Sequence, residues 1–177
     1  TASTNGGITS ITNGDILAAG GGIVLQSYES GDVELTHTGN VEGDGQHGIY
    51  ATANGEVTAT VTGDVRGKVD AIHLEGHASG YGLTLDQTGS VTADEGYGVY
   101  ADALGTVDVS VNGAVDAGGT GIYANSSESN VIVEHFGGTL TARDGDGIVA
   151  KAPNSTVSVT NTGTLEAQGF GIYAESG

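Results

Sequence analysis

The chain has 177 residues, with 33 glycines, one proline and no cysteine, and its 22 Asp and Glu against four Lys and Arg give a formal net charge of −18. So negative a surface repels phosphate backbones, which argues against a nucleic-acid partner, and the lack of cysteine excludes disulfides and thiol chemistry. No stretch is apolar for long enough to cross a membrane, so we expect no membrane insertion by this segment.

A four-residue motif recurs seven times along the chain. A small residue is followed by Ile or Val, any residue, and Ala or Leu, as in Gly48-Ile49-Tyr50-Ala51. The branched aliphatic members of the seven copies are Ile23, Ile49, Ile72, Val99, Ile122, Ile148 and Ile172. They lie 26, 23, 27, 23, 26 and 24 residues apart. A repeat of this length is typical of a solenoid, in which each repeat forms one coil.

Each repeat contains three short predicted strands. In the clearest copy they begin near Ile49, Val57 and Val65, and the alternation of aliphatic and polar residues indicates strands with one inward face. A glycine stands between the second and third strands of every repeat. This column consists of Gly14, Gly39, Gly63, Gly89, Gly113, Gly137 and Gly163. It predicts a corner whose backbone conformation excludes a side chain.

These features predict an all-β fold, a right-handed parallel β-helix with three short strands per turn and about 6–7 turns of 23–27 residues. Residues 1–177 are expected to form a single β-helix segment, because the period continues without a composition shift. At about 4.8 Å per turn the rod is roughly 30 Å long. One continuous buried ladder is expected at Ile49, Val99, Ile122, Ile148 and Ile172.

A second inward column contains polar residues. Two positions before the corner glycine stand His37, Val61, Gln87, Val111, His135 and Asn161, in phase with the inward Val33 and Leu35. The polar members could be ligands or a proton-sensitive site. The interpretation we favour is an internal ladder, hydrogen-bonded to the backbone of the corners.

Two outward columns are candidates for a contact surface. Tyr50, Tyr100, Tyr123 and Tyr173 are out of phase with the buried Ile and Val, and rigid aromatic rings with a polar tip suit binding to sugars or proteins. Stacking within the sheet explains the same column without a ligand. On another flank the candidate residues are Thr58, Thr60, Thr62, Thr160 and Thr162.

No catalytic, cofactor-binding or metal-binding residue is expected from the spacing of residues. No His/Glu spacing resembles a zinc site, and the basic pair Arg66 and Lys68 is expected to be a solvated turn. The Asp-Gly turns at Asp44 and at Asp144-Gly145-Asp146 leave calcium binding open, although they match neither an EF-hand loop nor a calcium-binding nonapeptide.

The pattern from Gly147 to Ala167, Gly-Ile-x-Ala, a turn, Val-x-Val-x-x-x-Gly-x-Leu-x-Ala, resembles the passenger repeats of bacterial autotransporters. The resemblance covers nearly the whole chain. It implies a right-handed β-helix exported through the outer membrane and displayed outside the cell, on the surface of a Gram-negative bacterium. The family's signal peptide and translocator barrel are absent, so we expect an excised part of a longer passenger.

The resulting functional hypothesis is a non-enzymatic, adhesin-type rod that acts by adhesion or self-association. Its expected partners are other copies of itself, a host or matrix protein, or a glycan. The alternatives are the scaffold of a polysaccharide-processing β-helix enzyme and a plain structural spacer.

Overall fold

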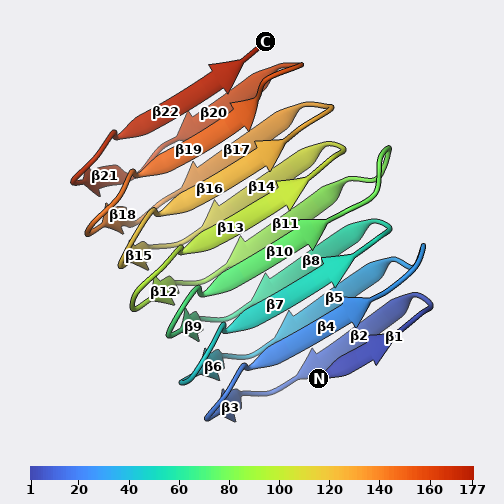
Figure 1. Cartoon of the computed structure of the whole chain (residues 1–177). Helices are drawn as coiled ribbons and strands as arrows, with labels where there is room; N and C mark the ends of the chain where they lie inside the picture. The colour runs from blue at the N-terminus through green and yellow to red at the C-terminus, as the bar shows by residue number, and fades with distance from the viewer.

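The computed structural model describes residues 1–177 as a solenoid of 22 strands with no helix. The chain runs along the near face, returns along the far face and rises by one strand per turn, which makes the coil right-handed (Figure 1). About seven turns of three strands stack along one axis, so the predicted β-helix is confirmed. No helix is present that could span a membrane.

Sheet A contains the strands that begin at the repeated Ile or Val, preceded by one N-terminal strand. In spatial order these are β1 (Ala2–Thr4), β4 (Ile23–Ser27), β7 (Ile49–Ala53), β10 (Ile72–Gly76), β13 (Val99–Ala103), β16 (Ile122–Ser126), β19 (Ile148–Ala152) and β22 (Ile172–Ser176).

Sheets B and C supply the other two faces of the coil. Sheet B consists of β2 (Ile8–Asn13), β5 (Val33–Thr38), β8 (Val57–Thr62), β11 (Leu83–Thr88), β14 (Val107–Asn112), β17 (Val131–Phe136) and β20 (Val157–Asn161). Sheet C consists of β3 (Ile16–Ala18), β6 (Val41–Gly43), β9 (Val65–Gly67), β12 (Val91–Ala93), β15 (Val115–Ala117), β18 (Thr139–Ala142) and β21 (Thr164–Ala167).

All neighbouring strands are parallel and in register, so equivalent residues of successive turns lie side by side. Between β7 and β10, for example, Ile49 is opposite Ile72 and Tyr50 is opposite His73. Because side chains alternate between the two faces of a strand, this register creates columns of inward aliphatic residues and columns of outward residues.

The inward columns form one hydrophobic core of 34 buried residues. The predicted ladder is fully buried at Ile49, Val99, Ile122 and Ile148. The same column also includes Ile72, which is fully buried, and Ile23, which is 6 % exposed. The prediction was wrong for Ile172, which is 47 % exposed. Its strand β22 is the last in sheet A and pairs only with β19, so nothing covers its other side.

The corner glycines occupy backbone conformations that L side chains rarely adopt. From Gly14 to Gly113 every member of the column has a positive φ, for example 135° at Gly63. A Cβ on Gly63 would also collide with the carbonyl oxygen of Gly39 in the preceding turn. The sequence assigned Gly137 to this column, and that assignment was wrong. The corner after β17 has an extra residue, so Gly138 is the glycine that stacks against Gly113.

The polar inward column is an internal hydrogen-bonded ladder. His37, Gln87 and His135 are almost completely buried. Gln87 Nε2 donates to the Gly63 carbonyl over 2.8 Å, and His135 Nε2 lies 2.9 Å from the Gly113 carbonyl oxygen. Gln87 and His135 therefore bond to the corners of the preceding turn, as expected from the sequence. His37 differs: its Nδ1 lies 2.8 Å from Thr12 Oγ1, and its Nε2 has no hydrogen-bond partner.

Candidate functional site

The outward face of sheet A carries stacked aromatic rings over four successive turns. This aromatic column consists of Tyr50, His73, Tyr100 and Tyr123. Centroids of neighbouring rings are 5.3, 4.4 and 5.2 Å apart, and the last two pairs are nearly parallel, at 16° and 7°. In-register strands bring equivalent residues to about 4.8 Å, which is close to the spacing of stacked rings.

The fourth predicted tyrosine is separated from this column. In β19 the equivalent position is Val149, which is buried, and Tyr173 follows one turn later. The Lys151 ammonium lies 5.8 Å from the Tyr123 ring centroid and 5.6 Å from that of Tyr173. A cation placed between two ring faces is attracted to both, so Lys151 connects the two parts of the flank.

Burial affects the phenol groups of the column. It raises the pKa values of Tyr50, Tyr100 and Tyr123 above the ordinary value of tyrosine, and at Tyr100 the nearby Asp102 raises the pKa further. Tyr100 Oη donates to Asp102 Oδ2 over 3.2 Å. At neutral pH the column therefore presents neutral hydroxyl groups beside carboxylates.

The predicted threonine flank lies on the outward face of sheet B in two separate groups. Thr58, Thr60 and Thr62 belong to β8, whereas Thr160 belongs to β20 and Thr162 follows its last residue. Three turns separate the groups. The residues between Thr60 and Thr160 in the same column are Asp86, Ser110 and Glu134. The flank is thus not a continuous threonine surface.

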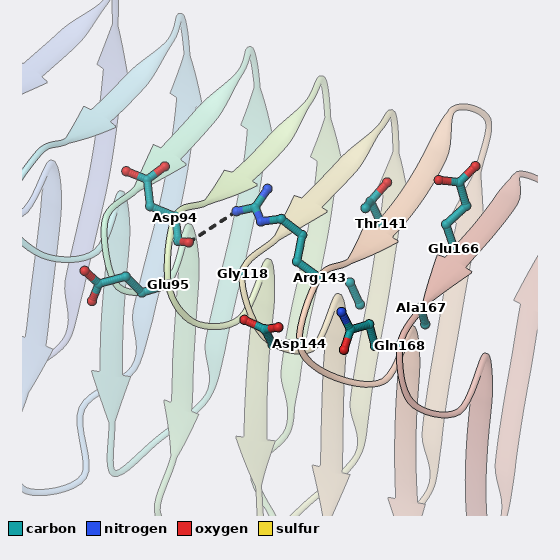
Figure 2. A pocket seen from close by; sticks show the side chains of 10 residues that line it. Asp94, Glu95, Gly118, Thr141, Arg143, Asp144, Glu166, Ala167 and Gln168 are labelled. Carbon is teal, nitrogen blue, oxygen red and sulfur yellow. Dashed lines mark hydrogen bonds between the residues drawn. The ribbon is translucent and has the colours of Figure 1, made fainter.

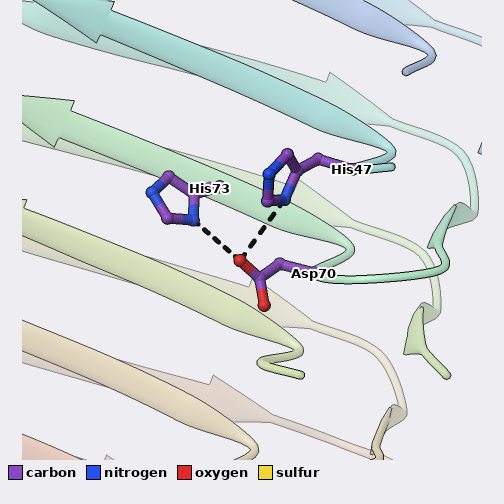
Figure 3. Close-up of side chains that lie close together, drawn as sticks. All are labelled: His47, Asp70 and His73. Atoms are coloured by element: carbon purple, nitrogen blue, oxygen red, sulfur yellow. Dashed lines mark hydrogen bonds and ion pairs between the residues drawn. The ribbon is translucent and has the colours of Figure 1, made fainter. Parts of the chain in front are cut away.

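A second feature, at the edge of sheet A where its strands begin, is a cluster of His47, Asp70 and His73, which we call the His–Asp–His cluster (Figure 3). His73 Nδ1 lies 2.7 Å from Asp70 Oδ2, and His47 Nδ1 lies 3.3 Å from the same oxygen. The three side chains are 17 %, 6 % and 19 % exposed for His73, Asp70 and His47, respectively. Two imidazole nitrogens thus converge on one largely buried carboxylate.

Asp70 occupies the turn immediately before β10, and its side chain is held from several directions. Its Oδ1 accepts a hydrogen bond of 2.7 Å from the Tyr97 N–H in the next turn. Burial by itself would raise the pKa of Asp70, but the two histidines and this N–H outweigh burial and hold the pKa well below its ordinary range. Asp70 is therefore a buried carboxylate at neutral pH.

His73 is fixed by its neighbours on all sides. Its ring lies between those of Tyr50 and Tyr100, and its Nε2 is 3.2 Å from Glu75 Oε1. Burial lowers the pKa of His73, but Asp70 and Glu75 outweigh burial and raise it above the ordinary value. The arrangement can hold a proton on His73 and, chemically, could instead hold a cation between the three side chains.

Sequence reasoning did not identify this cluster, although the repeat contained the signal. His47 and Asp70 both stand two positions before the repeated Ile of successive turns, and His73 stands one position after it. The spacing of residues within one segment of chain does not reveal the cluster, because its members come from two turns. Comparing equivalent positions in neighbouring repeats would have placed them together.

An open hollow lies beside the turns that follow the strands of sheet C (Figure 2). It is lined mainly by polar side chains, including Asp94, Glu95, Arg143, Asp144, Glu166 and Gln168. Arg143 forms an ion pair with Asp116 and donates to the Ala93 carbonyl over 2.9 Å. The one cation of the hollow thus already connects successive turns of the protein.

Arg66 of β9 and Asp146 of a turn are likewise engaged with the protein. Arg66 contacts Glu42 at 2.6 Å and Asp94 at 2.9 Å, so it is an exposed paired side chain and not simply a solvated turn. Asp146 Oδ1 accepts a hydrogen bond of 2.7 Å from the Phe170 N–H. Neither Asp-Gly turn brings three ligand groups together as the His–Asp–His cluster does.

Comparisons with protein-family models, with curated proteins and with solved structures find no match for this chain.

Proposed function

We propose that this chain is a segment of an adhesin-type rod, of the kind found in autotransporter passengers, which is displayed on a bacterial surface and self-associates through its side faces. The observation that supports the proposal is the aromatic column, a row of four stacked rings along one flat face of a repetitive rod. The proposal assigns the segment no catalytic activity.

Repetition is the physical argument for association between copies. Each turn offers only a small contact, but contacts in register along two rods act together, so an interaction of a few tenths of a kcal/mol per turn accumulates. Tyrosine suits such a face because its rigid ring gives contact area at a low entropic cost. The resemblance of the repeats to autotransporter passengers supports the same assignment.

Charge opposes association at low ionic strength. The net charge of −18 makes two rods repel each other, and salt shortens the range of that repulsion to roughly 10 Å at 0.1 M. We therefore expect this segment to be monomeric in dilute buffer and to associate weakly and reversibly as sodium chloride is added.

Sedimentation velocity over a salt series, with a chelator present, tests the proposal. The variant Y50T/Y100T/Y123T removes the tyrosines with residues that favour strands, and it should abolish the association induced by salt. The matched variant T60A/T62A/T160A alters the opposite flank and should associate like the wild type. Monomeric wild type at every salt concentration, together with longer protein that fails to clump cells, would favour a spacer. Binding on a glycan array without self-association would instead favour adhesion to sugars.

A further inference from the structure

We propose that the His–Asp–His cluster is a binding site for a divalent transition-metal ion, for which Zn²⁺ is the probe. Each of the three side chains offers one ligand atom, and these atoms all lie within 4.8 Å of one another. Both histidines direct Nδ1 toward Asp70 Oδ2. The inference goes beyond the proposed adhesive function and does not depend on it.

The distances in the cluster are near those of a metal site. Atoms that coordinate a tetrahedral zinc ion at about 2.1 Å lie roughly 3.4 Å from one another. Asp70 Oδ2 is 3.3 Å from His47 Nδ1 and 2.7 Å from His73 Nδ1. To hold an ion, the contact between Asp70 Oδ2 and His73 Nδ1 would lengthen by about 0.7 Å, whereas the contact with His47 Nδ1 already has the required length.

The donor atoms select the class of ion. Calcium and magnesium prefer six or more oxygen ligands, whereas two imidazole nitrogens and one carboxylate oxygen suit zinc and the neighbouring transition metals. Three protein ligands leave a further position on the ion for water or another molecule.

The surroundings of the cluster hold the ligands in place. Glu75 Oε1 lies 3.2 Å from His73 Nε2, the nitrogen that points away from the cluster, and the Tyr97 N–H holds Asp70 Oδ1. A carboxylate behind a ligating histidine fixes the ring orientation and strengthens the ligand in metal proteins. Tyr50 and Tyr100 additionally restrain the His73 ring by stacking on both sides.

His47 adds a detail to the geometry of the cluster. Its Nδ1 is buried, points at Asp70 (Figure 3) and makes no hydrogen bond. Its charged neighbour is Asp70 Oδ2, 3.3 Å away, and an ion between the two atoms would give Nδ1 a direct bond in place of this long contact.

Comparison with Asp146 distinguishes a structural role of Asp70 from a metal-binding role. It stands at the same position of the repeat as Asp70, and its Oδ1 likewise accepts the N–H of the next turn. The hydrogen bond to the next turn therefore explains the position of Asp70 Oδ1. It does not explain why two histidines converge on Oδ2 at this turn only.

The experiment is a zinc titration of the full 177-residue chain, freed of any affinity tag and of bound metal. We expect calorimetry to show one Zn²⁺ per chain and the melting temperature to rise with zinc, because an ion bound only by the folded state stabilises it. The ion would join His47 in one turn to Asp70 and His73 in the next. Cobalt(II) should give a visible absorption band typical of nitrogen and oxygen ligands.

The repeat itself supplies conservative variants. H73Y introduces the residue that the next turn carries at the same position, Tyr100, and H47Y introduces the residue found two turns on, Tyr97. D70N keeps an oxygen for the Tyr97 N–H. Each should weaken zinc binding about tenfold or more while far-ultraviolet circular dichroism remains that of the wild type. D146N is the matched control, since it removes the equivalent carboxylate without any histidine, and it should bind zinc like the wild type.

Three results would overturn the proposal. The first is the absence of zinc binding by the wild type. The second is unchanged affinity in H73Y and D70N, which would move the ion to exposed groups such as His77. The third is an equal rise of the melting temperature with calcium, which would show that any divalent cation stabilises the protein by neutralising its acidic surface.

Discussion

Tyr100 illustrates how a single side chain in this rod depends on its neighbours in other turns. Its ring is stacked between those of His73 and Tyr123, and its hydroxyl donates to Asp102. Burial and the Asp102 carboxylate both disfavour the phenolate, so the pKa of Tyr100 lies well above the ordinary value near 10. Because the folded state disfavours ionisation, the folded protein should lose stability as the pH rises above about 10.

The D102N variant tests this account of Tyr100. We predict that it shifts part of the phenolate titration, followed by near-ultraviolet absorbance, to lower pH, because it removes the charge but leaves the burial. D108N is the control, since Asp108 is an outward residue of β14 in sheet B. Identical titration curves for the wild type and D102N would show that Asp102 does not influence Tyr100.

At the scale of the element, the corner between sheets B and C depends on glycine for two separable reasons. Gly14 in the first turn has a φ of 97°, and no atom would lie within 4 Å of a Cβ placed there. Gly63 also has a positive φ, but a Cβ there would collide with the Gly39 carbonyl. The backbone conformation therefore disfavours a side chain at both corners, whereas the stacked neighbouring turn excludes one only at Gly63.

The paired variants G14A and G63A measure these two contributions. G14A should lower the free energy of unfolding by about 1 kcal/mol, the cost of a non-glycine residue in this conformation. G63A should cost roughly 1–3 kcal/mol more, because the neighbouring turn must move. Urea denaturation provides both values. Equal losses would mean that the corners yield without strain, contrary to the close stacking.

At the scale of the whole molecule, a residue's burial depends on its distance from the ends of the rod. The strands of each turn pair only with those of its two neighbours, so a central turn is covered on both sides and a terminal turn on one. Ile122 and Ile148 are fully buried, whereas Ile172, in the same column, is 47 % exposed. Within residues 1–177, the same motif is therefore buried in a central turn and half-exposed in the last one.

Substituting the same charge at two points of this column tests the dependence on position. I122D places an unpaired carboxylate between two turns and should cost several kcal/mol. I172D leaves the carboxylate in contact with water and should cost about 1 kcal/mol or less. Thermal and urea unfolding provide the comparison. A large loss of stability in I172D would show that the last strand is buried in solution.

Much of this architecture could be predicted from the sequence because the repeat has two strong periodicities. Alternation along each strand separates Val57 and Ala59, which face inward, from Thr58 and Thr60, which face outward. The interval of about 25 residues indicates which residues stack. From these two facts follow the three strands per turn, the buried polar ladder and the aromatic flank.

The sequence by itself determined the coil, its core and its outward columns, since these depend only on alternation and stacking. The tertiary structure decided what depends on neighbours in other turns and on side-chain direction. It exposed Ile172 through the end of the stack, moved a corner from Gly137 to Gly138, and brought His47, Asp70 and His73 together. The distances that make this cluster a candidate metal site are set by the paths of two turns and by rotamers, and neither property is encoded in the repeat period.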